Sequence, residues 1–526
     1  MQAIGTSSQP LIGAVNSWLS CFKSELVPVV LPTGFQPHAP TAKPELEAAL
    51  KRLDAHKQDW IKTSNLERAK LLRRCINTTA KASAKACQAA EAAKGSYGTG
   101  LGEECLLWVS IVMGLRQYAE SLEAGLRPLP TRKRTRGNGQ VVVEVFPQRL
   151  DAVMFGGARG ELWLQPGRPS TQGQTCEAKL KEKMKGSSIA LVLGAGNQVP
   201  VVMLDILHML LTEHSVVICK INPANDYIGP YVREAFLPLV ELGVLEIVYG
   251  GVSEGAFLCE HPSVGLIHLT GATSTYDAIV WGKTPKEEGR QPPCKKHVTA
   301  ELGCVTPYII VPAKWTQADM EYYASEIVAG LVNNGAHNCT KVELIVTDAA
   351  WPQREEFAEV LRKRLDEEPR RVSWYPGSRE RLNHAKQSIP GLRELGQRAE
   401  SGPQASTSSG PSQSASSGSN VYEPWLLSTG LTPDQANTTH ENWMAWGAFP
   451  GNKPHDIGSG NCFVHNIHMY DHVQKSVLWM PWRLYPTHFY DTQNKNQHAM
   501  AKATMRYAGS PNLLTLSSAA MAGLFA

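Results

Sequence analysis

At 526 residues the chain is long enough for two or three domains with sizeable apolar cores. A hydrophobic content of 42% and a charged content of 19% describe an ordinary globular protein, and a net charge of only +4 argues against a dedicated nucleic-acid-binding protein. No stretch offers about 20 uninterrupted apolar residues, so we expect no membrane span.

The cysteines and the N-terminus indicate the compartment. Eleven cysteines are scattered without a Cys-x-x-Cys pair, which favours reduced thiols over a disulfide scaffold. The chain has no arginine before Glu25, whereas a transit peptide would be rich in arginine and serine. We therefore expect a cytoplasmic protein, with organelle targeting as the alternative.

The first third of the chain is expected to be irregular and then helical. Prolines recur through residues 1–42, and a helical pattern begins at Lys43, where leucines at 46, 50 and 53 share one face. The segment 63–67 offers an N-cap for a second helix. A basic run at 131–136 is expected to be a solvated loop, with a nuclear or phosphate-binding patch as the alternative.

Four β-rich runs then alternate with helix-like segments and predict a parallel, doubly wound sheet. The runs are 188–194, 215–220, 244–249 and 266–270. Sheets of this kind bind ligands at the carboxyl ends of their strands. Gly194-x-Gly196 begins a dinucleotide fingerprint, but Val199 occupies the third glycine position, so this motif alone is weak.

Two of these strand ends carry residues suited to a nucleotide. Lys220 follows the second run, and its charge and three donors could hold a ribose or phosphate oxygen; a solvated lysine is the alternative. Gly271 follows the fourth run and would let the backbone approach a ligand closely.

A carboxylate and a thiol stand out further along. Glu301 lies in a short Glu-Leu-Gly segment, and Cys339 lies in a polar, glycine-containing turn before the apolar run 342–346. An aldehyde-oxidising or acyl-transferring thiol enzyme needs a thiol to attack a carbonyl and a carboxylate to activate water. A buried inert cysteine and a salt-bridged carboxylate are the structural alternatives.

Three segments resemble the aldehyde dehydrogenase superfamily in the family's own order. Glu301-Leu302-Gly303 followed by Pro307 is similar to its Glu-Leu-Gly-Gly-x-x-Pro segment. Asn333-x-Gly335-x-x-x-Cys339 resembles its nucleophile segment, and Leu269-Thr270-Gly271-Ala272-Thr273 resembles its Phe-Thr-Gly-Ser-Thr nucleotide segment. The resemblance covers roughly residues 181–346.

The resemblance implies an α/β fold of the aldehyde dehydrogenase type. This fold has a Rossmann-type nucleotide-binding domain, an α/β catalytic domain and a small oligomerisation arm. The resemblance also implies that the chain forms a homo-dimer or homo-tetramer. We accordingly expect an irregular N-terminal segment (1–42), a helical region with the nucleotide-binding domain (43–300), a catalytic domain (301–400), a low-complexity linker (401–420) and the remainder of the catalytic domain with a bridging region (421–526).

The resemblance also implies NAD- or NADP-dependent oxidation of a small-molecule aldehyde. Cys339 would be the nucleophile and Glu301 would take protons. Asn197 would donate to the oxyanion, with Gln198 as a near rival because the register to Pro200 is ambiguous. The cofactor-binding residues would be Lys220, Asn222, Gly271, Ala272, Thr273 and Leu302.

The chain departs from the family at several positions. Tyr276 stands where many members have glycine, and no Glu-x-Phe-Gly-Pro segment follows the nucleophile. Counted from Gly335, many relatives place the nucleophile where Asn338 stands, so Cys339 implies a one-residue insertion. A catalytically degenerate binding or structural protein, and an acyl-transferring or reducing relative, therefore stay open as alternatives. Glu301 argues against acyl transfer, because such relatives tend to lack this carboxylate.

Three histidines near the C-terminus have metal-like spacing. They are His465, His468 and His472. Alternation along the run 462–469 would put the first two on opposite faces of a strand, and no Glu or Cys partner falls in register. We expect no metal site there.

Overall fold

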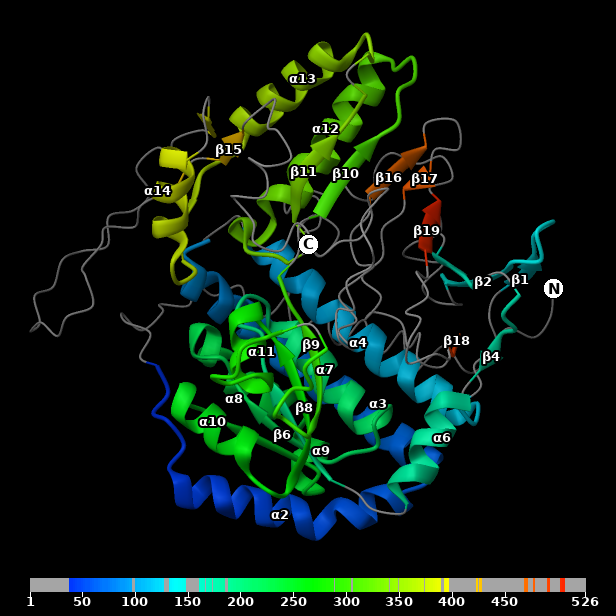
Figure 1. The fold of residues 1–526 in the computed structure, drawn as a ribbon, viewed down its shortest axis with the longest axis vertical. Helices are drawn as coiled ribbons and strands as arrows, with labels where there is room; N and C mark the ends of the chain where they lie inside the picture. Colours follow the sequence, from blue (N-terminus) through cyan, green and yellow to red (C-terminus); the bar gives the residue numbers. More distant parts are fainter. Residues whose placement is uncertain are drawn as a thin grey trace, which may run out of the picture.

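The computed structural model describes residues 37–396 and several short strands beyond them (Figure 1). Short gaps in the first range fall at 97–99, 127–131, 148–159, 166, 173, 185–187, 288, 304–305, 340, 349, 373 and 389–391. The later strand residues are 422–423, 425–427, 468–471, 476–477, 490–491 and 502–506. The predicted low-complexity linker lies outside the described residues.

A five-stranded parallel sheet forms the centre of the larger lobe. Its strands are β5 (Ile189–Leu193), β6 (Val217–Lys220), β7 (Leu245–Val248), β8 (Val264–Thr270) and β9 (His297–Glu301), in the order β7-β6-β5-β8-β9. The four predicted runs all form strands, which confirms the doubly wound sheet, and β9 adds a fifth. The strand order reverses between β5 and β8, so the ligand edge of the sheet is expected there.

The helices around this sheet follow the apolar pattern of the sequence. Helix α7 (Val199–Leu211) packs against β5, β6 and β8, and α2 (Lys43–Lys62) lies across β5, β6 and β7. The predicted leucine face of α2 is buried. Helix α3 (Asn65–Lys94) begins at the predicted cap, where Ser64 and Glu67 form a capping box.

Helices α3 and α4 (Leu101–Glu123) pack together beside α7. The remaining helices of the lobe are α6 (Gln174–Lys183), η1 (Pro223–Ile228), α8 (Gly229–Ala235), α9 (Leu237–Glu241), α10 (Val252–Glu260) and α11 (Thr273–Val280).

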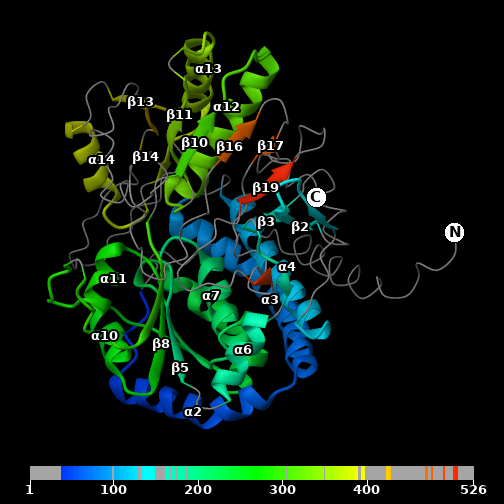
Figure 2. The same cartoon turned by 45° about the vertical axis from the view of Figure 1, so that its right-hand side comes forward.

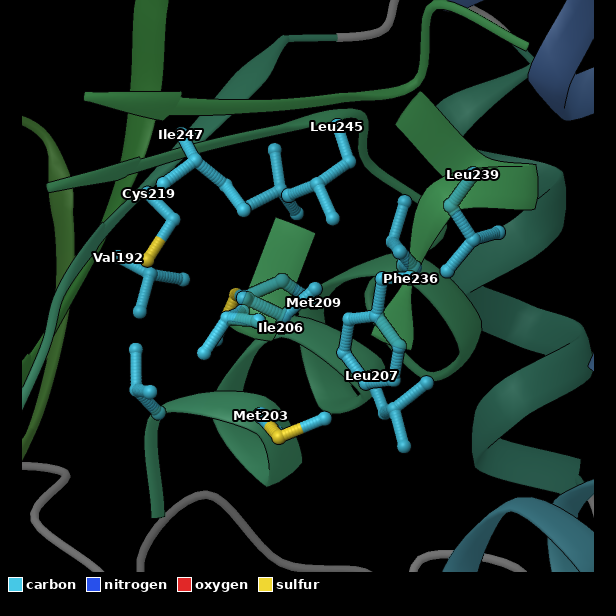
Figure 3. Packing of buried hydrophobic residues seen from close by; sticks show 14 of the residues in the cluster. Val192, Met203, Ile206, Leu207, Met209, Cys219, Phe236, Leu239, Leu245 and Ile247 are labelled. Carbon is cyan, nitrogen blue, oxygen red and sulfur yellow. The ribbon is translucent and has the colours of Figure 1, made fainter. Parts of the chain in front are cut away.

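The core of the larger lobe lies between the sheet and α7 (Figure 3). Val192 and Cys219 from the sheet lie on the side of Ile206, whereas Leu207 lies beside Phe236. Burying a side chain such as leucine contributes about 1.5–3 kcal/mol. The apolar run therefore fixes α7 and, with it, the loop before its first turn.

A second, smaller core belongs to the upper lobe (Figure 2). Strands β10 (Thr306–Ile310) and β11 (Val342–Val346) are parallel, and α12 (Gln317–Val332) connects them. Helix α13 (Arg354–Glu367) packs against α12. These strands end an eight-stranded sheet of order β1-β2-β3-β19-β17-β16-β10-β11. Its other members are β1 (Arg132–Thr135), β2 (Val141–Phe146), β3 (Gly160–Trp163), β16 (His468–Asp471), β17 (Ser476–Val477) and β19 (Lys502–Arg506).

Two predictions of local structure are wrong. The basic run forms the strand β1 and not a loop, because it pairs with β2 and Arg134 bonds to Glu161 at 3.0 Å. The charged sequence from Arg379 to about Glu400 also predicts a helix, but α14 (Ser378–Ser388) ends at Ser388, and β13 (Arg393–Leu395) pairs with β15 (Trp425–Leu427).

Three further pieces complete the described structure. Strand β12 (Arg371–Val372) pairs with β14 (Tyr422–Glu423), β4 (Thr171–Gln172) pairs with β18 (Tyr490–Asp491), and η2 (Asn333–Ala336) follows α12. Across the helices that the structure describes, none has the length and apolarity needed to span a bilayer.

Candidate active site

The segment 333–339, which we call the nucleophile turn, has an unusual backbone. It begins where α12 ends, and φ is +56° at Asn334, +63° at Gly335 and +64° at Ala336. Left-handed conformations are easy for glycine, tolerated by asparagine and costly for alanine. The turn ends at Cys339, whose side chain is exposed. Exposure suits a reactive thiol better than a core one.

The nucleophile turn contacts the loop between β5 and α7. The Nδ2 of Asn197 donates to the carbonyl of His337 at 2.8 Å, and the Nε2 of Gln198 donates to Oδ1 of Asn338 at 2.6 Å. Both predicted oxyanion donors thus lie beside the predicted nucleophile segment, although 140 residues separate each pair. Their amide groups are engaged with the turn itself.

Asn334 connects the turn to three other parts of the fold. Its Nδ2 donates to the carbonyl of Asn197 at 2.9 Å and to Oδ1 of Asn338 at 3.0 Å. Its Oδ1 accepts from Nζ of Lys94 at 2.8 Å, and its backbone N–H donates to Glu103 at 2.9 Å. The side chain of Asn334 therefore makes hydrogen bonds on both sides of its amide.

Below the turn lies a buried ion pair at the end of α3. Lys94 and Glu104 are each 3% exposed as side chains, and their Nζ and Oε1 atoms are 2.5 Å apart. Burial raises the pKa of Glu104, and the nearby Lys94 opposes this rise. A small cavity of about 10 Å³ lies beside the pair, and Arg371 and Trp374 contribute to its lining.

His337 lies among aromatic rings on the far side of the turn. Its ring centroid is 5.3 Å from those of both Trp374 and Tyr375, and its Nε2 is 3.3 Å from Oγ of Ser378. Burial lowers the pKa of His337 to about 3, with smaller contributions from the cations Arg381, Lys341 and Lys94. The imidazole next to the proposed nucleophile is therefore neutral at physiological pH.

Glu301 ends β9 at the carboxyl edge of the sheet and is half-buried. It pairs in register with Thr270, and its carbonyl accepts from the N–H of Gly271 at 2.9 Å. Leu302 follows and packs against the larger core. The carboxylate and the proposed nucleotide segment thus end neighbouring strands.

A buried polar cluster underlies this edge. Nε2 of His268 is 3.3 Å from Asp205, and its Nδ1 is 2.8 Å from Oγ1 of Thr299. The other oxygen of Asp205 accepts from Thr270 at 2.9 Å. Asp205 and His268 are 1% and 5% exposed, so α7, β8 and β9 are joined by polar as well as apolar contacts.

The proposed cofactor residues occupy two places on the edge. Lys220 ends β6, where its Nζ donates to the carbonyl of Gly250 at 2.9 Å and burial lowers its pKa. The Nδ2 of Asn222 donates to the carbonyl of Gly194 at 3.2 Å, and its Oδ1 accepts from the N–H of Ala224. Both side chains already bond to the loops around them.

The other cofactor residues lie where β8 leads into α11. Gly271 and Ala272 are exposed, and Thr273 begins the helix. Exposed backbone before a helix N-terminus is chemically suited to phosphate. Tyr276 packs against the larger core, and burial raises the pKa of its hydroxyl. The tyrosine ring is thus partly accommodated by the core, and the donor set at this corner fits a dinucleotide phosphate.

Sequence reasoning missed the residues beneath the turn. Lys94 sits at the end of an alanine-rich helix and Glu104 in the first turn of α4, where each has the pattern of a surface charge. Only Asn334-Gly335 gave a local signal, since this pair favours left-handed backbone. No group of three or more candidate metal ligands occurs among the residues described, and His465 and His472 lie outside them.

Comparison with known proteins bears on the same region. The model of the aldehyde dehydrogenase family matches residues 201–370. The 2-aminomuconic semialdehyde dehydrogenase of Danio rerio is 34% identical over 120 residues, which cover 23% of this chain and 21% of that relative. The chain therefore aligns with about a fifth of this curated relative.

Solved structures resemble the chain at lower identity. A salicylaldehyde dehydrogenase from Pseudomonas putida G7, complexed with salicylaldehyde, has a TM-score of 0.47 and 15% identity, covering 68% of this chain and 65% of the other. Proline utilization A from Bradyrhizobium japonicum has a TM-score of 0.49 and 16% identity, covering 74% and 35%. The family match and the curated relative agree with the ordered motifs, and both indicate similarity to the aldehyde dehydrogenase superfamily, which the family model places within residues 201–370.

Proposed function

We propose that this protein oxidises an aldehyde to a carboxylic acid with NAD or NADP, using Cys339 as nucleophile. The proposal rests chiefly on one observation: the amides of Asn197 and Gln198 bond to the turn that carries Cys339. In this proposal the loop with Asn197 and Gln198, the thiol of Cys339 and the carboxylate of Glu301 all lie at the carboxyl edge of the parallel sheet.

The chain's own residues divide the reaction as follows. Glu301 takes the proton of the Cys339 thiol and passes it to solvent, and the sulfur bonds to the aldehyde carbon. The carbonyl oxygen becomes an oxyanion that Asn197 or Gln198 stabilises; one such donor is worth about 3–4 kcal/mol. When bound, NAD+ or NADP+ supplies the hydride acceptor that converts the thiohemiacetal to a thioester. Glu301 takes a proton from water, the water oxygen bonds to the acyl carbon, and the carbon–sulfur bond breaks to release the acid and Cys339.

The cofactor would lie along the carboxyl edge of the parallel sheet. We assign Gly271, Ala272 and Thr273 to its phosphates and Lys220 to a ribose, with Asn222 and Leu302 beside them. The exposed backbone at 271–272 supports the first assignment. Lys220 would have to exchange its bond to Gly250 for one to the cofactor.

The same proposal divides the chain into a nucleotide-binding domain up to residue 300 and a catalytic domain from residue 301. The two apolar clusters support this division, because one draws on residues 46–300 and the other on residues 308–365. The β1–β2 hairpin would form the oligomerisation arm of a homo-dimer or homo-tetramer. Sedimentation velocity of a variant in which Arg132 and Arg134 of β1 are replaced tests whether this hairpin forms the arm.

A catalytically degenerate binding protein is the second candidate. One observation favours it: one N–H of the Asn197 amide and one N–H of the Gln198 amide already hold the turn. In the proposed enzyme, the second N–H of one of these amides has to reach the oxyanion.

The deciding experiment measures NAD+ and NADP+ binding by calorimetry and then aldehyde-dependent formation of reduced cofactor. We expect binding of one cofactor, turnover by the wild type, and a loss of turnover in Cys339→Ala that Cys294→Ala does not share. Because Cys294 is half-buried and lies outside the turn, it is a matched thiol control. Failure of both cofactors to bind at millimolar concentration would overturn the oxidation proposal in favour of the second candidate.

A separate variant tests whether the nucleophile belongs at position 339 or at position 338 of the turn. The double exchange Asn338→Cys with Cys339→Asn moves the thiol to the position counted from Gly335 in many relatives. If Cys339 is the nucleophile, the exchanged protein loses turnover; if turnover rises, the thiol position is one residue wrong.

A further inference from the structure

Lys94 is a fully buried cation at the root of the nucleophile turn. It bonds to Glu104 on one side and to Oδ1 of Asn334 on the other, and its Nζ lies 5.1 Å from the ring centroid of Trp374. An ammonium group can only donate hydrogen bonds. The oxygen of the Asn334 amide must therefore face Lys94, and its NH2 group must face away.

This orientation agrees with the two hydrogen bonds that the Asn334 amide donates on its other side. With its NH2 turned away from Lys94, Asn334 donates to the carbonyl of Asn197 and to Oδ1 of Asn338. Oδ1 of Asn338 also accepts from Gln198, so the NH2 of Asn338 is left to donate to Asn333 at 2.5 Å. Each amide has one orientation that satisfies its neighbours, and a flip of the first would oppose two like groups at the next.

The backbone explains why the turn needs such a scaffold. Asn334 and Ala336 hold left-handed conformations that cost free energy for residues other than glycine. The backbone N–H of Asn334 donates to the carboxylate of Glu103. This carboxylate is held in turn by two hydrogen bonds from Arg371, at 2.7 Å and 3.0 Å. The conformation that presents Cys339 is thus imposed by groups from α3, α4 and β12.

We propose that Lys94 and Asn334 are positioning residues: Lys94, together with the acceptor-only carbonyl of Asn197, orients the Asn334 amide in a hydrogen-bond network that holds the nucleophile turn against Asn197 and Gln198. The inference rests on the proposed function in one respect, namely that Cys339 is the reacting thiol. Lys94 and Asn334 act through the turn, and neither needs to touch substrate.

The first test removes the donor without leaving a buried charge. Lys94→Met combined with Glu104→Met deletes the ion pair, whereas Lys94→Arg keeps a donor-only cation. In the double variant the Asn334 oxygen loses its donor, and only the carbonyl of Asn197 still orients the amide. We expect kcat to fall by about tenfold to about 100-fold, as for a small misplacement of a reacting group, with the cofactor KM unchanged within about twofold. Lys94→Arg is expected to recover most of this loss.

A second test does not depend on turnover. The rate of Cys339 alkylation by iodoacetamide is measured from pH 6 to pH 10, with the modified peptide identified by mass and Cys294 as internal reference. Asn334→Asp keeps the shape and the acceptor for Lys94, but its carboxylate cannot donate to Asn197 or Asn338. Because a nearby carboxylate by itself raises the pKa of a thiol, the deciding variant is Asn334→Gly, which adds no charge and tolerates the left-handed backbone. We expect its alkylation rate at pH 7.5 to fall by about threefold or more, because the turn no longer holds Cys339 in place.

The outcomes separate positioning from mere structural support. If these residues only stabilise the fold, the melting temperature falls while the folded protein keeps the wild-type alkylation profile. An alkylation rate within about twofold of wild type in Asn334→Gly would overturn the proposal, whether or not the double methionine variant folds. Absence of aldehyde oxidation by the wild type would count against the proposed function alone, because the alkylation profile still decides the positioning role.

Discussion

Helix α7 and the nucleophile turn lie next to each other at Asn197, but different interactions hold them. Nearly every residue of α7 is buried among apolar side chains of the sheet and of neighbouring helices. The turn instead depends on a few directional hydrogen bonds and one buried ion pair. Apolar contacts are numerous and non-directional, whereas each polar bond in the turn has no substitute.

This difference has a consequence for mutation. A change in the apolar core should lower stability in proportion to the volume removed and leave the thiol alone. A change in the polar network should affect both stability and the reactivity of Cys339. The predictions below test this separation.

The largest effect is expected when the buried ion pair is broken. Lys94→Met leaves the carboxylate of Glu104 buried without its cation. Removing one partner of a buried pair typically costs about 3–5 kcal/mol. We expect a loss of this size in the free energy of unfolding, measured with urea.

The control is the double variant in which Glu104 is also replaced by methionine. It should recover most of the lost stability, because no isolated charge remains. A loss below about 1 kcal/mol in the single variant would show that the pair contributes little and would weaken the contrast between the turn and the sheet.

Leu207→Ala tests the apolar side of the comparison. Leu207 is 0% exposed in the core between α7 and the sheet (Figure 3). Large-to-small changes of this kind cost about 2–5 kcal/mol, and we expect about 3. The same change at Leu106, which is 49% exposed on α4, should stay within about 0.5 kcal/mol. The alkylation rate of Cys339 in folded Leu207→Ala should equal that of the wild type, and a change there would contradict the separation.

How far the sequence predicts the molecule follows the same division. The apolar runs that became β5, β6, β7 and β8 specify their own strands locally, so the parallel sheet could be predicted. The basic run at 132–135 could not, because its pairing with β2 outweighs its charge. Local pattern is sufficient where burial decides the structure and insufficient where a distant partner does.

The candidate site shows the limit more sharply. Glu301, Cys339 and Asn197 lie in segments that the sequence identifies as candidates, and in the structure the nucleophile turn contacts Asn197. Lys94 carries no such segment, since its role depends on Asn334, which lies 240 residues away. A lysine at a helix end predicts a solvated charge, and only the packing of α3 against α4 and the turn makes it a buried donor.

Glu326 is an exception to the contrast, because it places a carboxylate beside the smaller apolar core. Its Oε2 accepts from the hydroxyl of Tyr308 at 3.2 Å, and burial raises its pKa from 4.5 to about 7. The folded state therefore holds the proton more tightly than the unfolded state, and this contribution to stability is present below about pH 4.5 and is lost as the pH rises to about 7. The free energy of unfolding of Glu326→Gln should exceed that of the wild type by about 3 kcal/mol at pH 8 and by less than about 0.5 kcal/mol at pH 4.5. If the free energies of unfolding of the two proteins changed in the same way between pH 4.5 and pH 8, the raised pKa of Glu326 would be contradicted.

The smallest expected effect concerns His337, whose imidazole lies within the turn. Burial lowers its pKa to about 3, so in the folded protein it stays neutral at mildly acidic pH, whereas in the unfolded chain it takes up a proton near pH 6.5. A lowered histidine pKa makes the unfolded state bind more protons, so stability falls as the pH drops below about 6.5. Between pH 7.5 and pH 5.5 the wild type should lose about 1 kcal/mol more than His337→Gln, measured by urea unfolding at each pH. The same replacement at the exposed His384 serves as the control. Equal losses in the wild type and His337→Gln would mean that the turn opens enough to let the imidazole protonate, and the rigid polar scaffold described for this turn would then be wrong.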